Sequence, residues 1–432
     1  MEAAVLFGTF FILLILTVPI GYAIGIATLV AVVVCGDGSI PLLMISQKSI
    51  TGVDSFPLMA IPFFMLAGNL MSGGGIAKRI LNFFDTFMGL ITGGLSMVTT
   101  ITCMFFAAIS GSAVATTSAV GSFMIPEMKE KGYDEGYSAS ICAAAGTIGV
   151  IIPPSVPFVI YGVVVGASKA SITDLFKAGV VPGIGMGVAL MIACYILSKK
   201  HGFKGTNNKF SLKAVGKSFL DAVWALLSPV IILGGIYSAV VTPTEAAVLS
   251  VVYALIVSLF IYRTLGFKDL IPVFVEGVKT YAPVVFIVSA ATAFGRVLAI
   301  LQVPQSVAAW VGGLGLNKIV LILMVNLLLL FVGMIMDTGP AIMILTPILL
   351  PIVEAVGVNP IHFGIIMVVN LAIGFVTPPV GVNLYVASTL TKIPPMTIAK
   401  RAMPAIAVFF VALMLITFIP DISLVLVHIL KG

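Results

Sequence analysis

The chain breaks an apolar helix in the same way twice. The segment Gly149–Pro154 recurs 225 residues later as Gly374–Pro379, within the predicted broken helices 137–166 and 361–390. Proline lacks a backbone donor and clashes with the preceding turn, so two in succession break a helix. Inside a membrane, broken backbone is tolerated only where protein or water satisfies the freed groups. Matching breaks in two halves of one chain therefore predict the ligand site of a repeat-built transporter.

Composition supports a membrane protein. Only 9% of the 432 residues are charged and 60% are hydrophobic, whereas a soluble domain carries about 25% charged residues. Apolar segments long enough to span a bilayer recur along the chain, and we count roughly ten to twelve passes and half-passes. The four cysteines and three histidines are scattered, without metal-ligand or disulfide spacing. This pattern argues against a metalloenzyme or an intramembrane protease.

A basic linker divides the chain at residues 199–220. The positive-inside rule places this linker in the cytoplasm, and its lysines are Lys199, Lys200, Lys204, Lys209, Lys213 and Lys217. Counting passes from there puts sixteen basic residues inside and five outside. The net charge of +6 therefore reflects orientation in a lipid bilayer, and we expect no nucleic acid partner.

Residues 1–198 and 221–432 are predicted to be two repeats of one structure. Pro19 matches Pro243 at nearly the same offset as the two helix breaks. By the pass count, the first broken helix enters the membrane from the cytoplasm and the second enters from outside. The halves are therefore related by inversion, an arrangement known in secondary transporters.

A hairpin that turns inside the membrane is predicted just before each broken helix. Two full crossings within residues 92–126 would have about 17 residues each, which is barely enough to span a bilayer, and Ser110-Gly111-Ser112 is the expected tip. Residues 319–355 form the second hairpin, with Asp337-Thr338-Gly339-Pro340 at its tip. The predicted fold is thus an all-α, multi-pass, inverted-repeat secondary transporter with two re-entrant hairpins and two broken helices.

Three further segments complete the predicted architecture. Residues 40–54 and 263–280 have mixed polarity and fit interfacial arm helices, one in each half. Residues 4–35 are apolar and contain Pro19, which leaves open one long bent helix or two short helices.

Two cation sites are predicted where the hairpin tips meet the broken helices. Unwound carbonyl groups and small hydroxyl side chains supply the hard oxygen ligands that sodium accepts. The alternative is that these small residues only allow close helix packing. Because they stand beside a double proline twice, we favour sites for Na+, with two or more ions transported. The predicted residues are Ser110, Ser112, Gly149, Ile152 and Pro153 for the first site, and Gly333, Gly339, Gly374, Thr377 and Val380 for the second.

Three charged residues lie in apolar segments. Asp337 is at a hairpin tip where the first half has the uncharged Ser110, which suggests a role toward substrate hydroxyls or a basic group. Glu245 follows a Thr-Pro-Thr sequence and is predicted to be a structural acid in a first helical turn. Arg296 could meet a substrate carboxylate or extend to the membrane interface, and the sequence leaves both open.

Four motifs together resemble the large membrane subunit (M subunit) of tripartite ATP-independent periplasmic (TRAP) transporters. The motifs are AISGS at 108–112 with Thr116-Thr117, IPPS at 152–155, MDTGP at 336–340 and VTPP at 376–379. The resemblance covers essentially the whole chain. It implies an elevator-type, sodium-driven importer of a bacterial inner membrane, in which a mobile transport domain carries both hairpins past a scaffold.

The resemblance also implies partners and a substrate. The partners are a small four-helix membrane subunit (Q subunit) and a periplasmic substrate-binding protein (P subunit). The substrate is an organic acid such as a C4-dicarboxylate or a sialic acid, and we expect a transporter and not an enzyme. By this analogy Ser110, Ser155 and Asp337 line the substrate cavity, and we add Ser112 and Asn383 to the predicted substrate-binding residues.

Two alternatives stay open at this point. One is a stand-alone cation-coupled anion transporter of similar architecture, which needs no binding protein. The other is the membrane subunit of an ion-pumping decarboxylase, which couples carboxylate turnover to ion movement.

Overall fold

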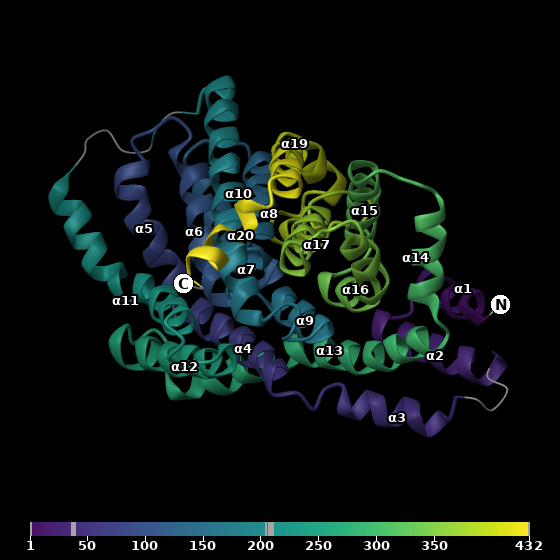
Figure 1. Ribbon diagram of the computed structural model, residues 1–432. Coiled ribbons are helices and arrows are strands. Elements are labelled where there is room, and N and C mark those ends of the chain that lie inside the picture. The colour runs from purple at the N-terminus through teal and green to yellow at the C-terminus, as the bar shows by residue number, and fades with distance from the viewer. Residues whose placement is uncertain (1, 36–39, 204, 206–210, 431–432) are drawn as a thin grey trace.

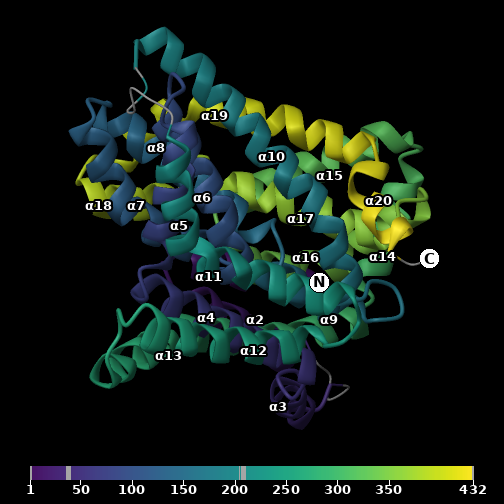
Figure 2. The ribbon, with the colours of Figure 1, turned by 90° about the vertical axis from the view of Figure 1, so that its left-hand side faces the viewer.

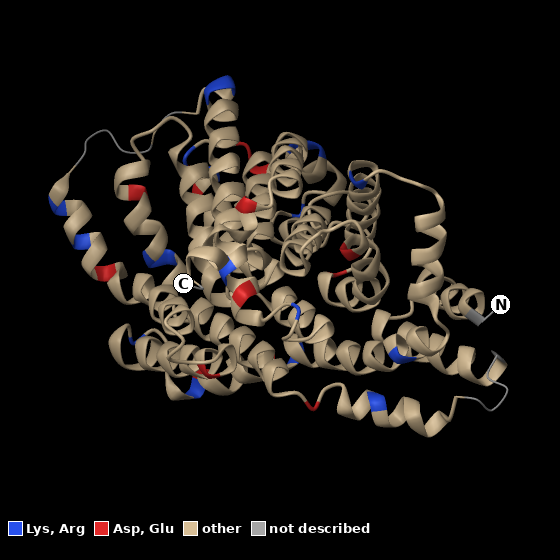
Figure 3. Ribbon diagram, viewed as in Figure 1, with Lys and Arg blue, Asp and Glu red and all other residues tan. Residues whose placement is uncertain are grey.

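The computed structural model describes residues 2–35, 40–203, 205 and 211–430, and every regular element in these ranges is a helix (Figure 1). Seven helices are long and apolar enough to cross a membrane, and charged residues are sparse along them (Figure 3). The predicted all-helical, multi-pass membrane fold is therefore confirmed. Lys204 and Lys209 of the basic linker lie outside the described residues.

One set of helices forms a layer, of which α2, α4, α12 and α13 are seen in the lower part of Figure 2. Within it α4 packs against α12 and α13, and α2 also packs against α13. Helices from both halves of the chain therefore build this layer. Its elements are α1 (Glu2–Ile15), α2 (Ile20–Cys35), α3 (Leu42–Thr51), η1 (Phe56–Met59), α4 (Ala60–Gly73), α11 (Leu212–Tyr237), α12 (Pro243–Ile256), η3 (Val257–Ile261) and α13 (Phe267–Ile300).

The remaining long elements form a bundle above the layer in Figure 2. Here α8 packs against α18 and α19, so the two halves mix again. The bundle consists of α6 (Gly94–Ser110), α7 (Ala113–Glu130), α8 (Glu135–Thr147), η2 (Ile148–Val150), α9 (Val156–Val165), α10 (Ile172–His201), α15 (Lys318–Gly333), α16 (Thr338–Ala355), α17 (Pro360–Gly374), α18 (Val382–Thr391), α19 (Pro395–Phe418) and α20 (Asp421–Ile429).

Two shorter helices link the layer to the bundle. The first, α5 (Ile76–Met88), follows Gly75, whose φ of 65° turns the chain sharply after α4. It buries one apolar face, which includes Ile76, Ile80 and Phe84, and packs between α11 and α6. The second, α14 (Val303–Gly313), follows α13 and packs against α16. Each half thus reaches its hairpin through one such link.

Both predicted hairpins are present. The first turns at Gly111-Ser112 between α6 and α7, as expected. The second turns at residues 334–337, three residues before the predicted tip at 337–340, and Thr338–Pro340 form the first turn of α16. The shift has a simple cause, because Asp337 caps α16 and proline is tolerated in a first helical turn.

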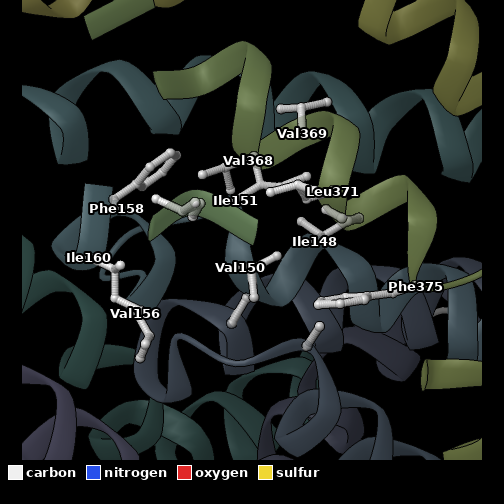
Figure 4. Packing of buried hydrophobic residues seen from close by; sticks show 14 of the residues in the cluster. Ile148, Val150, Ile151, Val156, Phe158, Ile160, Val368, Val369, Leu371 and Phe375 are labelled. Atoms are coloured by element: carbon white, nitrogen blue, oxygen red, sulfur yellow. The ribbon is translucent and has the colours of Figure 1, made fainter. Parts of the chain in front are cut away.

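Both predicted breaks are also present. The first separates α8 and η2 from α9, and the second separates α17 from α18. The Pro153–Pro154 and Pro378–Pro379 bonds are both cis. Apolar side chains from the two broken helices pack together in the core of the bundle, including Ile151 from the first and Leu371 from the second (Figure 4). The two breaks therefore belong to one packed core.

Three other predicted features, all outside the site, can be compared with the structure. The first 35 residues form two helices, because the chain turns at Thr17, whose φ is 60°, before Pro19. The segment 263–280 is not separate, since its helical part continues into the 34-residue helix α13. Glu245 completes a capping box with Thr242 at the start of α12, which agrees with its predicted structural role.

Candidate functional site

The tip of the first hairpin carries a compact group of oxygen atoms. The Ser110 hydroxyl lies 3.0 Å from the Thr116 hydroxyl, which donates to the Ser112 carbonyl oxygen at 2.7 Å. Ser112 also caps α7, its Oγ accepting from the Ala115 amide at 3.4 Å. Ser110 and Thr116 are fully buried, while Ser112 is half-buried. Three oxygen atoms from one tip thus converge within the protein.

The first broken helix closes over this tip. The Val156 amide donates to the Gly111 carbonyl oxygen at 3.3 Å, which joins the hairpin to the start of α9. Gly149 lies against the oxygen group, because a Cβ there would be 2.7 Å from both the Ser112 carbonyl oxygen and the Thr116 hydroxyl. The structure therefore brings Ser110, Ser112 and Gly149 together, as the sequence predicts for one site.

The other first-half residues line the back of the break. The Ser155 hydroxyl donates to the Val150 carbonyl oxygen at 2.6 Å and accepts from the Phe158 amide at 3.4 Å. Ser155 is fully buried, so it fastens the break internally and caps α9. Ile152 packs against α10, where a Cβ on Gly183 would approach its side chain to 2.5 Å. Pro153 is buried beside it.

The second half repeats this connection with different side chains. The Val380 amide donates to the Met334 carbonyl oxygen at 3.2 Å, joining the second tip to the second break as Val156 joins the first. Gly333 and Gly374 are in backbone contact. The Thr377 hydroxyl donates to the Ile373 carbonyl oxygen at 2.8 Å. Gly333, Gly374, Thr377 and Val380 are thus gathered around one tip.

Asp337 is an exposed acid at the second hairpin tip. Its Oδ1 accepts from the Thr338 amide at 2.6 Å and caps α16. Its neighbours Met336 and Thr338 are buried, while Asp337 itself keeps accessible surface. Gly339, two residues on, instead faces α9, where an added Cβ would lie 3.5 Å from the Ile160 side chain.

Asn383 connects the two broken helices. Its amide nitrogen donates to the Ala143 carbonyl oxygen of α8 at 3.1 Å, across 240 residues of chain. Its own backbone amide donates to the Phe375 carbonyl oxygen at 3.0 Å. The residue is fully buried, and its amide oxygen has no hydrogen-bond partner among the described residues. Of the five predicted substrate-binding residues, only Ser112 and Asp337 have substantial accessible surface.

Thr116 joins the first group although it is not among the predicted site residues, and Thr117 follows it in α7. Thr116 bonds to Ser110 and Ser112 as described above. Thr117 is fully buried, its hydroxyl lacks a partner in the described ranges, and it lies against Gly146 of α8. A signal existed in the sequence, because Thr116 stands four residues after Ser112 and therefore on the same face of a helix.

The oxygen atoms at the two hairpin tips are ligands that suit a small hard cation. They are hydroxyl and carbonyl oxygens, the ligand type found for sodium in unwound transporter helices. Within the described residues there is no group of three or more His, Cys, Asp or Glu side chains that could hold a metal ion. The chemistry of these atoms therefore favours an alkali cation over a transition metal.

Comparison with known families and proteins identifies the class. The family model described as the DctM component of tripartite ATP-independent periplasmic transporters matches residues 7–422. The isethionate TRAP transporter permease protein DctMQ of Oleidesulfovibrio alaskensis is 49% identical over 97% of this chain, which spans 65% of that protein's length. The C4-dicarboxylate TRAP transporter large permease protein DctM of Pseudomonas aeruginosa is 41% identical over 90% of this chain and 92% of its own length.

A third relative carries a similar name, and a solved structure has a similar fold. The sialic acid TRAP transporter large permease protein SiaM of Vibrio cholerae is 38% identical over 96% of both chains. The crystal structure of the Alcanivorax borkumensis YdaH transporter matches the fold with a TM-score of 0.64, at 15% identity, over 87% of this chain and 88% of its own. This chain therefore belongs to the DctM component family of tripartite ATP-independent periplasmic transporters.

Proposed function

We propose that this chain is the membrane permease of a sodium-coupled importer for a small organic anion. One observation carries the proposal. Each hairpin tip is hydrogen-bonded to a broken helix, through the Gly111 carbonyl to the Val156 amide and through the Met334 carbonyl to the Val380 amide. Unwound backbone of this kind inside a membrane bundle is expected where ions and substrate bind.

The substrate class follows from helix termini and from the relatives. Helices α7 and α16 begin at the two tips, and α9 begins at the first break. The positive ends of their dipoles favour an anionic group nearby. The relatives named above are assigned to C4-dicarboxylates, sialic acid and isethionate, which are carboxylates and a sulfonate. We therefore propose that the substrate is a small organic carboxylate or sulfonate.

Coupling and movement are proposed together. Bound sodium at the two oxygen groups would hold each tip against its broken helix and complete the substrate site around Asp337. The bundle would then move past the layer as one body, with α5 and α14 as the flexible links between them. This is an elevator mechanism, and it requires that the bundle stays intact while its contacts with the layer change.

Partners and location belong to the same proposal. We infer a small permease subunit beside this chain and a periplasmic binding protein that delivers the anion, in a bacterial inner membrane. The name DctMQ of the isethionate relative, and its greater length, are consistent with a small permease joined to the large one in that protein.

Sodium dependence is the first test. The chain, its small permease and its binding protein would be reconstituted in liposomes, and uptake of a labelled C4-dicarboxylate, a sialic acid and isethionate would be followed. We expect uptake of at least one anion that needs both an inward sodium gradient and the binding protein. Unchanged uptake in choline would contradict the coupling. Full uptake without the binding protein would favour a stand-alone carrier.

The first oxygen group gives a sharper test. Thr116→Val removes one hydroxyl at nearly constant volume, so the half-saturating sodium concentration should rise by roughly tenfold, the loss of about one strong polar contact. The matched control is Thr99→Val on the same hairpin, because the Thr99 hydroxyl bonds to Leu95 of its own helix and to Met128. Equal sodium dependence of the two variants would refute the assignment of Thr116 to a cation site.

A further inference from the structure

A cavity of about 200 Å³, lined by both polar and apolar side chains, lies at one end of the bundle, away from both hairpin tips. Its lining includes Lys318, Asn359, His362, Thr417 and Phe418. These residues come from the starts of α15 and α17 and from the end of α19. Figure 2 shows α19 running to the right-hand end of the bundle, where it meets α20. The positive-inside count places this end of the bundle on the non-cytoplasmic side of the membrane.

His362, which lines the cavity, has a ring nitrogen without a hydrogen-bond partner among the described residues. His362 is only 3% exposed, and its Nε2 lies 3.3 Å from the Thr417 carbonyl oxygen. A carbonyl oxygen only accepts, so Nε2 carries the proton and Nδ1 of the neutral ring is an acceptor. Nδ1 has no partner among the described residues. A buried acceptor left unpaired is costly, so a ligand that donates N–H groups would be stabilised here.

The mouth of the cavity, in contrast, favours an anionic group. Lys318 is exposed, its ammonium contacts the Gly357 carbonyl oxygen at 3.4 Å, and no described carboxylate forms an ion pair with it. The positive ends of α15 and α17 meet at the same place, capped by Asn317 and Asn359. The C-terminus of α19, which is the negative end of its helix dipole, lines the same cavity. The cavity is therefore complementary to a group with one cationic and one anionic part.

An apolar groove lies on the other side of the corner between α19 and α20. It has a volume of about 380 Å³ and is lined by Pro182, Met186, Leu415, Ile416 and Ile422, among others. Residues 415 and 416 line the groove, and Thr417, which follows them directly, lines the cavity described above. The groove and the cavity therefore share one turn of α19. An apolar groove does not hold ordered water. In a membrane it accepts a hydrocarbon chain.

From this juxtaposition we propose that the corner of α15, α17, α19 and α20 binds one phospholipid with a primary ammonium head group. The phosphate lies at Lys318 and the helix starts. The ammonium donates to Nδ1 of His362 and to carbonyl oxygens at the end of α19, and an acyl chain enters the apolar groove. A simple anion leaves the His362 acceptor unpaired, and a simple cation is repelled by Lys318. Only a zwitterion whose cationic group carries N–H donors satisfies both ends.

Native mass spectrometry of the purified full chain tests this inference, with phosphatidylethanolamine, phosphatidylcholine and phosphatidylglycerol as probes. Phosphatidylcholine lacks ammonium N–H donors and phosphatidylglycerol lacks the ammonium. We expect phosphatidylethanolamine to bind about tenfold more tightly than either, the difference of roughly one charge-assisted hydrogen bond. Equal affinity for the three lipids overturns the proposal.

Two variants and a soluble probe complete the test. Lys318→Gln alters an exposed residue whose ammonium contacts only the Gly357 carbonyl oxygen among the described residues, and it should weaken phosphatidylethanolamine binding by about tenfold. Lys48→Gln removes the same charge from exposed α3, far from the cavity, and should leave binding unchanged. Equal binding by the two variants overturns the proposal. So does free phosphoethanolamine binding as tightly as the lipid, because the acyl chain then contributes nothing.

Discussion

Replacing Gly374 by alanine should nearly abolish transport, by roughly 100-fold, while the protein still inserts and can be purified. A Cβ on Gly374 would overlap the backbone of Gly333, and a Cβ on Gly333 would lie 2.9 Å from Cα of Leu371. Backbone atoms cannot move aside as a flexible side chain does. Overpacking of this kind costs about 1–3 kcal/mol, which is roughly a 5- to 150-fold change between two states. Here the cost falls on the contact between the second tip and the second break.

The matched control for Gly374→Ala is Gly234→Ala in α11. That position is also helical, but nothing lies within 4 Å of its added Cβ, so transport and thermal unfolding should stay at wild-type levels or improve slightly. Uptake rate and sodium affinity would be measured for both variants. Normal sodium affinity in Gly374→Ala would show that the contact between Gly333 and Gly374 does not hold the second cation site.

The helix breaks can be predicted because their cause is local. Two successive prolines remove two donors and exclude the preceding helical conformation, whatever surrounds them. The first hairpin tip is predictable for the same reason, since Gly111 takes a φ of 60° between two serines. The second tip lies three residues before its predicted position. Asp337 is both a break in an apolar run and a helix cap, and the sequence pattern does not separate these two roles.

The contacts between segments far apart in the chain cannot be predicted in this way. Asn383 reaches Ala143 across 240 residues, and Gly374 meets Gly333 across 41 residues of chain. No local pattern records which residues of two distant segments touch. The same limit explains Ser155, which the family resemblance assigns to the substrate cavity but whose hydroxyl is committed to Val150 and Phe158. Residue type predicts which atoms are polar, and only packing decides which of them face a ligand.

Asp337 is the residue at which charge and structure can be separated most cleanly. Its carboxylate caps α16, and asparagine caps helices about as well as aspartate. Asp337→Asn should therefore keep the unfolding temperature while removing the negative charge from the hairpin tip. A charged acceptor contributes about 1.5–3 kcal/mol per hydrogen bond. If the carboxylate receives a substrate hydroxyl, the transport rate should fall by roughly 10- to 100-fold.

Asp337→Ala is the companion variant, because it removes the charge and the cap together. It should lose transport as Asp337→Asn does and should also unfold at lower temperature, since loss of a cap costs about 1 kcal/mol. Uptake kinetics and thermal unfolding of the two variants then give different readouts for the two roles. Wild-type transport in Asp337→Asn, with loss only in Asp337→Ala, would mean that this acid serves α16 alone. Substrate binding would then depend on the backbone dipoles and on the hydroxyl groups of the tips. Because these groups carry no net charge, they would bind different anions with little discrimination.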